Sequence, residues 1–130
     1  MQNMNDVFIA ARTEEAVLWL TLNRPKRRNP LCSNMIAALT GAITAGSMDP
    51  GIRVIVIKAL GPAFSAGHDL QETRRRDGED QTAWEVRIDR LLQDCAAMMT
   101  RILHAPKPIV ACVQGIASAA GCQLVSACDL

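Results

Sequence analysis

Two apolar segments, each followed by a glycine-containing bend of small residues, most constrain how this chain can fold. The first is "RVIVIKAL" (53–60), followed by "GPAFSAGHDL" (61–70), and the second is "IVACVQG" (109–115), followed by "GIASAAGCQL" (115–124). Runs rich in β-branched residues and bounded by such bends are typical of strands buried on both faces. Because each bend leads into a helical pattern, the sequence predicts largely parallel strands connected by helices, an α/β fold.

Longer patterns supply the other large elements of this fold. Apolar runs at 7–12 and 16–22 flank "TEE" and indicate a β-hairpin. Apolar residues at helical spacing predict one helix that begins with Ser33 as its cap and is ended by "MDPG" (48–51). The same spacing, sustained over 81–104, predicts a long amphipathic helix.

Two shorter helices complete the predicted order of elements. Asp69 and Glu72 have the spacing of a capping box, with Asp69 as the N-cap residue. The last helix follows the second bend, with Ser118 near its N-cap. The order is therefore β-β-α-β-α-α-β-α, and no linker divides residues 1–130 into two domains.

Charge and composition exclude several classes of function. The formal net charge is +1 and aromatic residues make up 3% of the chain, so neither charge nor stacking platforms favour nucleic acid. The five cysteines form no C-x-x-C pair, so we expect no zinc or disulfide framework. No apolar run is as long as a membrane span, and the N-terminus has neither a signal nor a transit peptide pattern. We therefore expect a protein of the cytoplasm or the mitochondrial matrix.

The two bends are candidates for binding an oxygen atom through main-chain N–H groups. If Ser118 caps the last helix, the N–H groups of Ala119, Ala120 and Gly121 lack intrahelical partners and lie at the positive end of the helix dipole. The first bend can supply another N–H from residues 67–69. Two such groups that converge on one carbonyl oxygen form an oxyanion hole. The alternative is a pair of tight turns that bind no ligand, and spacing alone does not decide between them.

Three segments resemble motifs of the crotonase superfamily, the enoyl-CoA hydratase/isomerase family. They are "LNRPKRRNPL" (22–31), "AFSAGHDL" (63–70) and "KPIVACVQGIASAAGCQLVSACDL" (107–130), in the order and at the separations of that family. "FSAGHDL" and "ASAAGCQLV" are most similar to the branch typified by enoyl-CoA hydratase domain-containing protein 3. The resemblance implies the ClpP/crotonase fold, a spiral of ββα repeats. Family chains are longer, so residues 1–130 would be the N-terminal part of an acyl-CoA-binding domain whose C-terminal part is absent.

The resemblance also implies which residues would carry function. The main-chain N–H groups of His68 and Ala120 would hold the carbonyl oxygen of a coenzyme A thioester and stabilise its enolate. The family's cationic loop contacts the coenzyme A nucleotide, and the residues after the first bend form a wall of the same site. The substrate-binding residues are therefore expected to be Lys26, Arg28, Ala66, His68, Asp69, Leu70 and Ala120.

The resemblance carries further expectations about ligands and partners. The coenzyme A thioester is a substrate, so no metal and no tightly held cofactor is implied. The expected reaction is hydration or isomerisation of a fatty acyl-CoA. The full-length protein would be a homo-oligomer, trimeric or hexameric, with neither nucleic acid nor a membrane as a partner.

Two departures from the family pattern leave the activity open. The triplet is Ala119, Ala120 and Gly121, where three glycines are common, and the added methyl groups narrow the site but keep its N–H groups. Gln123 stands where the hydratases have a glutamate; an amide does not titrate, so it can hold water or a substrate oxygen but cannot act as a base. The alternative function is a non-catalytic acyl-CoA-binding or regulatory protein. A catalytic imidazole at His68 is a less favoured alternative, and the fragment alone is expected to be inactive.

Overall fold

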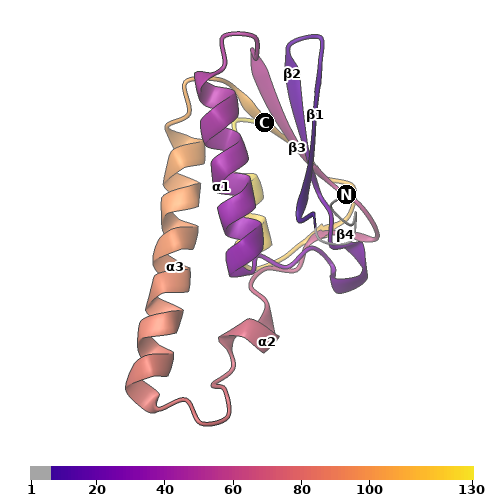
Figure 1. The fold of residues 1–130 in the computed structure, drawn as a ribbon. Coiled ribbons are helices and arrows are strands. Elements are labelled where there is room, and N and C mark those ends of the chain that lie inside the picture. Colours follow the sequence, from indigo (N-terminus) through magenta and orange to yellow (C-terminus); the bar gives the residue numbers. More distant parts are fainter. Residues whose placement is uncertain (1–6) are drawn as a thin grey trace.

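A four-stranded sheet lies beside two long helices in the computed structural model, which describes residues 7–130 (Figure 1). The strand order is β1-β2-β3-β5; β1 and β2 are antiparallel, whereas β3 pairs in parallel with both β2 and β5, as an α/β fold requires. Residues 1–6, part of the segment without a signal pattern, lie outside the described residues. The strands of this sheet are β1 (Ile9–Glu14), β2 (Val17–Leu22), β3 (Val54–Ala59) and β5 (Ile109–Cys112).

The predicted hairpin is confirmed as the pair of β1 and β2. Glu15 and Ala16 connect the strands with φ angles of 49° and 65°, and positive φ at both central positions is the feature of type I′ hairpin turns that matches strand twist. Leu20 and Leu22 of β2 are fully buried. The hairpin thereby supplies one side of the core, and β3 pairs with the side of β2 that faces away from β1.

The main apolar core lies between the sheet and two helices, α1 (Ser33–Met48) and α3 (Gln81–Leu103). In Figure 1, α1 lies between α3 and the sheet. The prediction of a long helix over 81–104 is confirmed to within one residue. Its N-cap is Asp80, whose carboxylate accepts a hydrogen bond from the Ala83 N–H at 2.7 Å. Core side chains include Leu20, Ile55, Ile57 and Ile109 from the sheet, Met35, Leu39 and Ile43 from α1, and Leu91, Met98 and Ile102 from α3.

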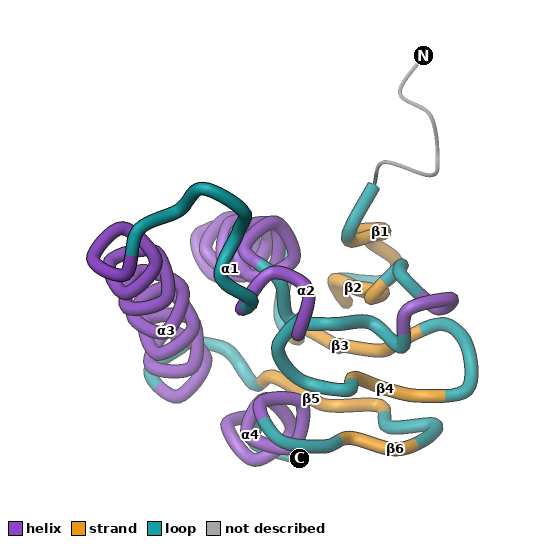
Figure 2. Tube along the Cα trace, turned by 90° about the horizontal axis from the view of Figure 1, so that it is seen from below, coloured by secondary structure: helices purple, strands orange, loops and turns teal. Residues whose placement is uncertain are grey.

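A second, two-stranded sheet carries the two bends. β4 (Ala63–Ser65) pairs in parallel with β6 (Ile116–Ala117). α2 (Leu70–Thr73) follows β4, and α4 (Ala120–Ala127) follows β6. The first bend is therefore the connection 66–69 and the second is the connection 118–119, and each leads from a short strand into a helix (Figure 2). The sequence predicts the bends and α4 but neither β4 nor β6, because so short a strand shows no alternating pattern.

The caps of α1 and α2 differ in part from the prediction. The N-cap residue of α1 is Cys32, not Ser33, because the N–H and the hydroxyl of Ser33 both bind the Glu72 carboxylate. Asp69 is the N-cap of α2 as predicted, and it accepts a hydrogen bond from the Gln71 N–H at 2.9 Å. Because the Glu72 carboxylate binds Ser33, Glu72 does not complete the capping box with Asp69. Its carboxylate ties α2 to the N-terminus of α1 instead.

Candidate functional site

The two glycine-containing bends lie against each other, at the end of the two-stranded sheet (Figure 2). Ser118 joins them: its N–H donates to the Ser65 carbonyl at 3.0 Å, and its hydroxyl donates to the Ala66 carbonyl at 3.3 Å. Ser118 lies near the N-cap of α4 as predicted, one residue before the N-cap residue Ala119, but no side chain caps this helix. The hydroxyl of Ser118 is directed at the first bend instead.

In the first bend, the main chain around Gly67 leaves the His68 N–H group without a partner among residues 7–130. Gly67 has a φ of +91°, which favours glycine, and its carbonyl accepts a hydrogen bond from the Leu31 N–H at 2.7 Å. In a trans peptide the C=O and the following N–H point in opposite directions, so the His68 N–H points away from Leu31. No acceptor within residues 7–130 binds this N–H.

In the second bend, the N-terminus of α4 presents unbonded N–H groups. The Ala119 carbonyl accepts a hydrogen bond from the Gln123 N–H at 3.1 Å, so the Ala120 N–H of the same peptide unit projects from the start of the helix. In the part of the chain that the structure describes, the N–H groups of Ala119 and Ala120 have no acceptor. Gly121 departs from the prediction, because its N–H donates to the Ser118 carbonyl at 2.8 Å.

The contact between the bends depends on the missing side chain of Gly67. A Cβ atom at this position would lie 3.2 Å from the Ala120 nitrogen and 3.1 Å from the Ser118 carbonyl oxygen. The Ala120 amide therefore lies beside the peptide unit that carries the His68 N–H. Two unbonded donors on touching segments, one of them at the positive end of a helix dipole, can bind an anion or a polarised oxygen.

Other predicted residues beside the bends lie as follows. Ala66 is exposed, Leu70 is 77% exposed, and Gln123 is exposed on α4 with no side-chain hydrogen bond to the residues that the structure describes. The imidazole of His68 is half-buried, with Nδ1 3.2 Å from the Leu31 carbonyl, so Nδ1–H donates there. The orientation of this ring, which the sequence did not indicate, is toward the 22–31 loop.

The cationic loop contains a short 3-10 helix, η2 (Pro25–Arg27), and its cations have different surroundings. Arg27, which the prediction left out, donates to the Asp69 carboxylate at 2.9 Å. Lys26 and Arg28 are exposed and form no side-chain hydrogen bond or ion pair within the described range. Asp69 thus acts as the helix cap that the sequence predicts and also as an ion-pair partner.

A basic hollow of about 630 Å³ lies beside this loop. Arg24 covers one side of it, with its guanidinium 3.9 Å from the centre of the Phe8 ring. Neither Lys26 nor Arg28 lines this hollow, although the loop that carries them borders it. Its other charged lining residues are Arg27, Asp69, Glu72, Arg76 and Arg87.

Two buried polar residues that support the bends were not identified from the sequence. Asn29 is fully buried, and its side-chain amide donates to the carbonyls of Leu60 at 2.9 Å and Ala63 at 3.0 Å. Ser65 is also fully buried and contacts both bends. Both residues lie in segments that resemble family motifs, Asn29 in 22–31 and Ser65 in 63–70. One sequence offers no signal that distinguishes a buried Asn or Ser from an exposed one in a loop.

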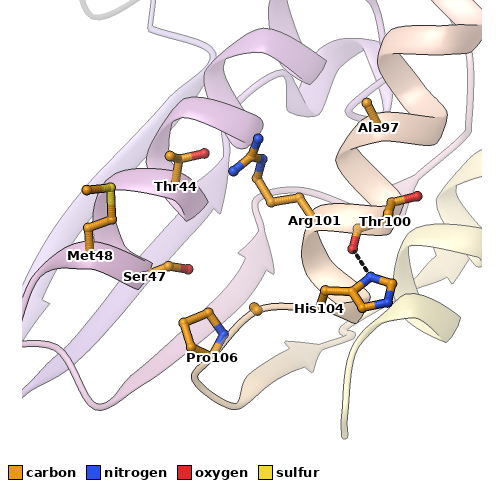
Figure 3. Close-up of a pocket in the computed structure, with 9 residues that line it drawn as sticks. Thr44, Ser47, Met48, Ala97, Thr100, Arg101, His104 and Pro106 are labelled. Atoms are coloured by element: carbon orange, nitrogen blue, oxygen red, sulfur yellow. Dashed lines mark hydrogen bonds between the residues drawn. The ribbon is translucent and has the colours of Figure 1, made fainter.

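A separate hollow of about 540 Å³ lies between the C-terminal ends of α1 and α3 (Figure 3). His104 lines it as the C-cap residue of α3, with Nδ1 2.9 Å from the Thr100 carbonyl. None of the predicted site residues lines this hollow. It is therefore separate from the candidate site.

Other chemical features of the chain are structural. The Asp129 carboxylate accepts a hydrogen bond from the Ile109 N–H at 2.8 Å. The cysteines are free thiols; burial, together with the Asp129 charge, raises the pKa of Cys128 to about 11.

Residues 7–130 hold no cluster of three or more His, Cys, Asp or Glu side chains suited to a metal ion. None of the helices in that range combines the length and the apolar character needed to cross a membrane.

Comparison with known proteins decides the family. A family model described as enoyl-CoA hydratase/isomerase matches residues 12–130. The chain belongs to the enoyl-CoA hydratase/isomerase family. It is 40% identical over 111 residues to the mitochondrial enoyl-CoA hydratase domain-containing protein 3 of Danio rerio, an alignment that covers 85% of this chain and 36% of that relative.

Solved structures of the family confirm the predicted crotonase-like fold. The human enoyl-CoA hydratase domain-containing protein 3 matches with a TM-score of 0.86 and 35% identity, over 95% of this chain and 47% of that one. An enoyl-CoA hydratase/isomerase family protein from Silicibacter pomeroyi matches with a TM-score of 0.84 and 41% identity, over 94% of this chain and 50% of that one. The chain therefore spans half or less of the length of these family members, and it resembles the predicted branch.

Proposed function

We propose that this chain binds an acyl- or enoyl-CoA thioester and holds its carbonyl oxygen between the main-chain N–H groups of His68 and Ala120. The observation that carries the proposal is that these N–H groups are unbonded and lie on bends in direct contact. Membership of the enoyl-CoA hydratase/isomerase family supports the class of ligand.

Two fixed donors of this kind would stabilise a thioester enolate, because its negative charge collects on the carbonyl oxygen. The removal of one such donor from an oxyanion hole costs about 10²- to 10³-fold in rate. The Ala120 N–H also benefits from the dipole of α4. Neither donor depends on a side chain, so alanines in place of glycines in the triplet leave both donors available.

The reaction that we propose for the full-length protein is hydration or isomerisation of a fatty acyl-CoA. Either reaction needs proton transfer by a group that titrates. Gln123 lies on α4 three residues after Ala120 and is exposed; its amide can orient water but cannot take a proton. Gln123 therefore favours a second candidate, a non-catalytic acyl-CoA-binding protein. An Asp or Glu of the full-length protein beside the thioester would favour catalysis.

We further propose that the coenzyme A phosphates lie near the cationic loop. Lys26 and Arg28 are exposed and without side-chain partners within residues 7–130, so their charges are available to an anion. Arg27 is held by Asp69. The adjoining basic hollow adds Arg76 from the loop after α2. Binding through these cations would weaken as ionic strength rises.

The organisation of the whole protein is also a proposal. Residues 1–130 would form the N-terminal part of an acyl-CoA-binding domain, which needs no metal and no tightly held cofactor. The full-length protein would form a homo-oligomer, trimeric or hexameric, with neither nucleic acid nor a membrane as a partner. The cytoplasm or the mitochondrial matrix would be its compartment, and the mitochondrial name of one relative supports the second.

Titration of the chain with acetoacetyl-CoA tests the proposed function, because this thioester absorbs differently in the ultraviolet when its enolate is stabilised. We expect saturable binding with an enolate signal. Ala120→Pro should abolish the signal, since proline lacks the N–H group. Saturable binding without the enolate signal would show that the thioester carbonyl does not lie between the His68 and Ala120 N–H groups. The absence of binding would refute the proposed function for this chain.

Gln81→Pro provides a matched control for this substitution. Gln81 is the first residue of α3, and Asp80 before it has φ −74° and ψ 167°, which a following proline accepts. This control also deletes an N–H group at a helix start, but at a distance from the bends. An equal loss of the enolate signal in both variants would show that Ala120→Pro acts through the fold and not through the missing donor.

A further inference from the structure

Ser65 is placed to control both bends at once. It is fully buried at the end of β4. Its hydroxyl donates to the Asn29 carbonyl at 2.8 Å and accepts a hydrogen bond from the Gly67 N–H at 3.3 Å. Its carbonyl accepts the Ser118 N–H at 3.0 Å. One residue therefore binds the first bend, the second bend and the loop that precedes α1.

The hydroxyl of Ser65 acts on the peptide units that lead to the His68 N–H. It holds the nitrogen of Gly67, while the Leu31 N–H holds the carbonyl of the same residue at 2.7 Å. Fixing both ends of Gly67 fixes its φ of +91° and the plane of the peptide that carries the His68 N–H. The direction of the His68 N–H is thus set by the two hydrogen bonds that hold Gly67.

The main chain of Ser65 acts on the second donor. A Cβ atom at Gly121 would lie 2.4 Å from the Ser65 carbonyl oxygen and 2.9 Å from its Cβ, so the first turn of α4 rests directly on Ser65. Because the Ala120 N–H lies in that turn, a shift of Ser65 moves both donors. Asn29 fixes Ser65 in turn, since its fully buried side chain binds the carbonyls of Leu60 and Ala63.

We propose that Ser65 is a positioning residue of the thioester site: its hydroxyl, through Gly67, and its main chain, through the first turn of α4, hold the His68 and Ala120 N–H groups at the separation that one oxygen atom needs. This inference rests on the proposed function. Ser65 is fully buried and would act without touching the substrate. A misplacement of about 1 Å in such a site can cost about a hundredfold in rate, so the removal of one hydroxyl has an effect on carbonyl polarisation beyond its effect on folding.

The decisive variants are Ser65→Ala, which removes the hydroxyl, and Ser65→Cys, which keeps a weak donor and acceptor of similar size. Ser126→Ala is the matched control, because the Ser126 hydroxyl is exposed on α4 and bonds only to the Cys122 carbonyl at 3.0 Å. Two probes separate polarisation from affinity. Acetoacetyl-CoA reports the enolate, whereas free coenzyme A reports nucleotide binding without a carbonyl.

We expect Ser65→Ala to lower the enolate signal by about tenfold or more, with the affinity for free coenzyme A nearly unchanged. Ser65→Cys should be intermediate, and Ser126→Ala should match the unsubstituted chain. An unchanged enolate signal in Ser65→Ala, or an equal loss of enolate signal and coenzyme A affinity, would overturn the positioning role. If Ser65→Ala does not fold, Ser65→Cys decides between the same outcomes.

A measurement without ligand keeps this inference distinct from the proposed function. In amide ¹H–¹⁵N spectra of the ligand-free chain, Ser65→Ala should shift and broaden the Gly67, His68 and Ala120 signals, and Ser126→Ala should leave them in place. If the unsubstituted chain binds no acetoacetyl-CoA, the proposed function fails, and these spectra alone decide whether Ser65 sets the donors. Unchanged His68 and Ala120 signals would refute the inference.

Discussion

Gly121 and Gly41 allow the contact between the bends to be tested by the same substitution at two helix positions. Gly121 lies in the first turn of α4, against Ser65, whereas Gly41 is exposed in the middle of α1. A Cβ atom at Gly41 would meet nothing within 4 Å, but at Gly121 it would lie 2.4 Å from the Ser65 carbonyl oxygen. Replacement by alanine should therefore have opposite effects at the two positions.

The size of each effect follows from the local geometry. Ordinary contact begins near 3.4 Å, so Gly121→Ala must displace α4 from Ser65 by about 1 Å, and the obstacle is backbone that cannot rotate away. Overpacking of this kind costs about 1–3 kcal/mol, partly offset by a helix propensity gain of about 0.5–1 kcal/mol. We expect a net loss of about 1 kcal/mol for Gly121→Ala and a gain of about 0.5–1 kcal/mol for Gly41→Ala.

Urea unfolding followed by circular dichroism measures the difference. With m values of about 1–3 kcal/mol per M, Gly121→Ala should lower the midpoint by about 0.5 M, and Gly41→Ala should raise it by a smaller amount. The Ala120 amide signal should move in Gly121→Ala only. If Gly121→Ala is as stable as Gly41→Ala, then α4 does not rest on Ser65 and the reasoning about the two bends is wrong.

Three further predictions concern the backbone, an ion pair and the thiols. Ala119 has φ 49° and ψ −123°, a strained region for alanine that costs about 1–3 kcal/mol, so Ala119→Gly should stabilise the chain against urea or leave its stability unchanged. The Arg87 hydrogen bond lowers the pKa of Glu79 to about 2. The stabilising contribution of this pair is therefore present above the ordinary value of 4.5 and lost as pH falls toward 2; an NMR titration with a Glu79 midpoint near 4.5 would contradict this. Iodoacetamide should label exposed Cys112 and Cys122 before Cys128, because burial raises the Cys128 pKa to about 11.

The four strands of the main sheet and the long helices could be predicted from the sequence because their patterns are local. Residues 53–60 consist mainly of β-branched and other apolar residues, and the helical period persists from 81 to 104, so β3 and α3 were located to within about one residue at each end. The main-chain candidates at His68 and Ala120 followed from the positions of glycine and other small residues, with the family motifs to specify them.

Tertiary competition for hydrogen bonds explains what the sequence could not predict. Ser33 and Ser118 both have the character of N-cap residues, yet Ser33 bonds to Glu72 and Ser118 bonds to the first bend. The distant partner decides in each case, and a local capping rule does not include it. The supporting roles of Asn29 and Ser65 also depend on partners that are distant in the sequence, so local patterns do not predict them.

The central claim is that the N–H groups of His68 and Ala120 bind one thioester oxygen, and amide NMR during a titration with acetoacetyl-CoA tests it most directly. The claim predicts that both amide protons move downfield together, with the same half-saturation as the enolate absorbance. It is contradicted if the ligand binds while only one of these two signals moves, or while neither does.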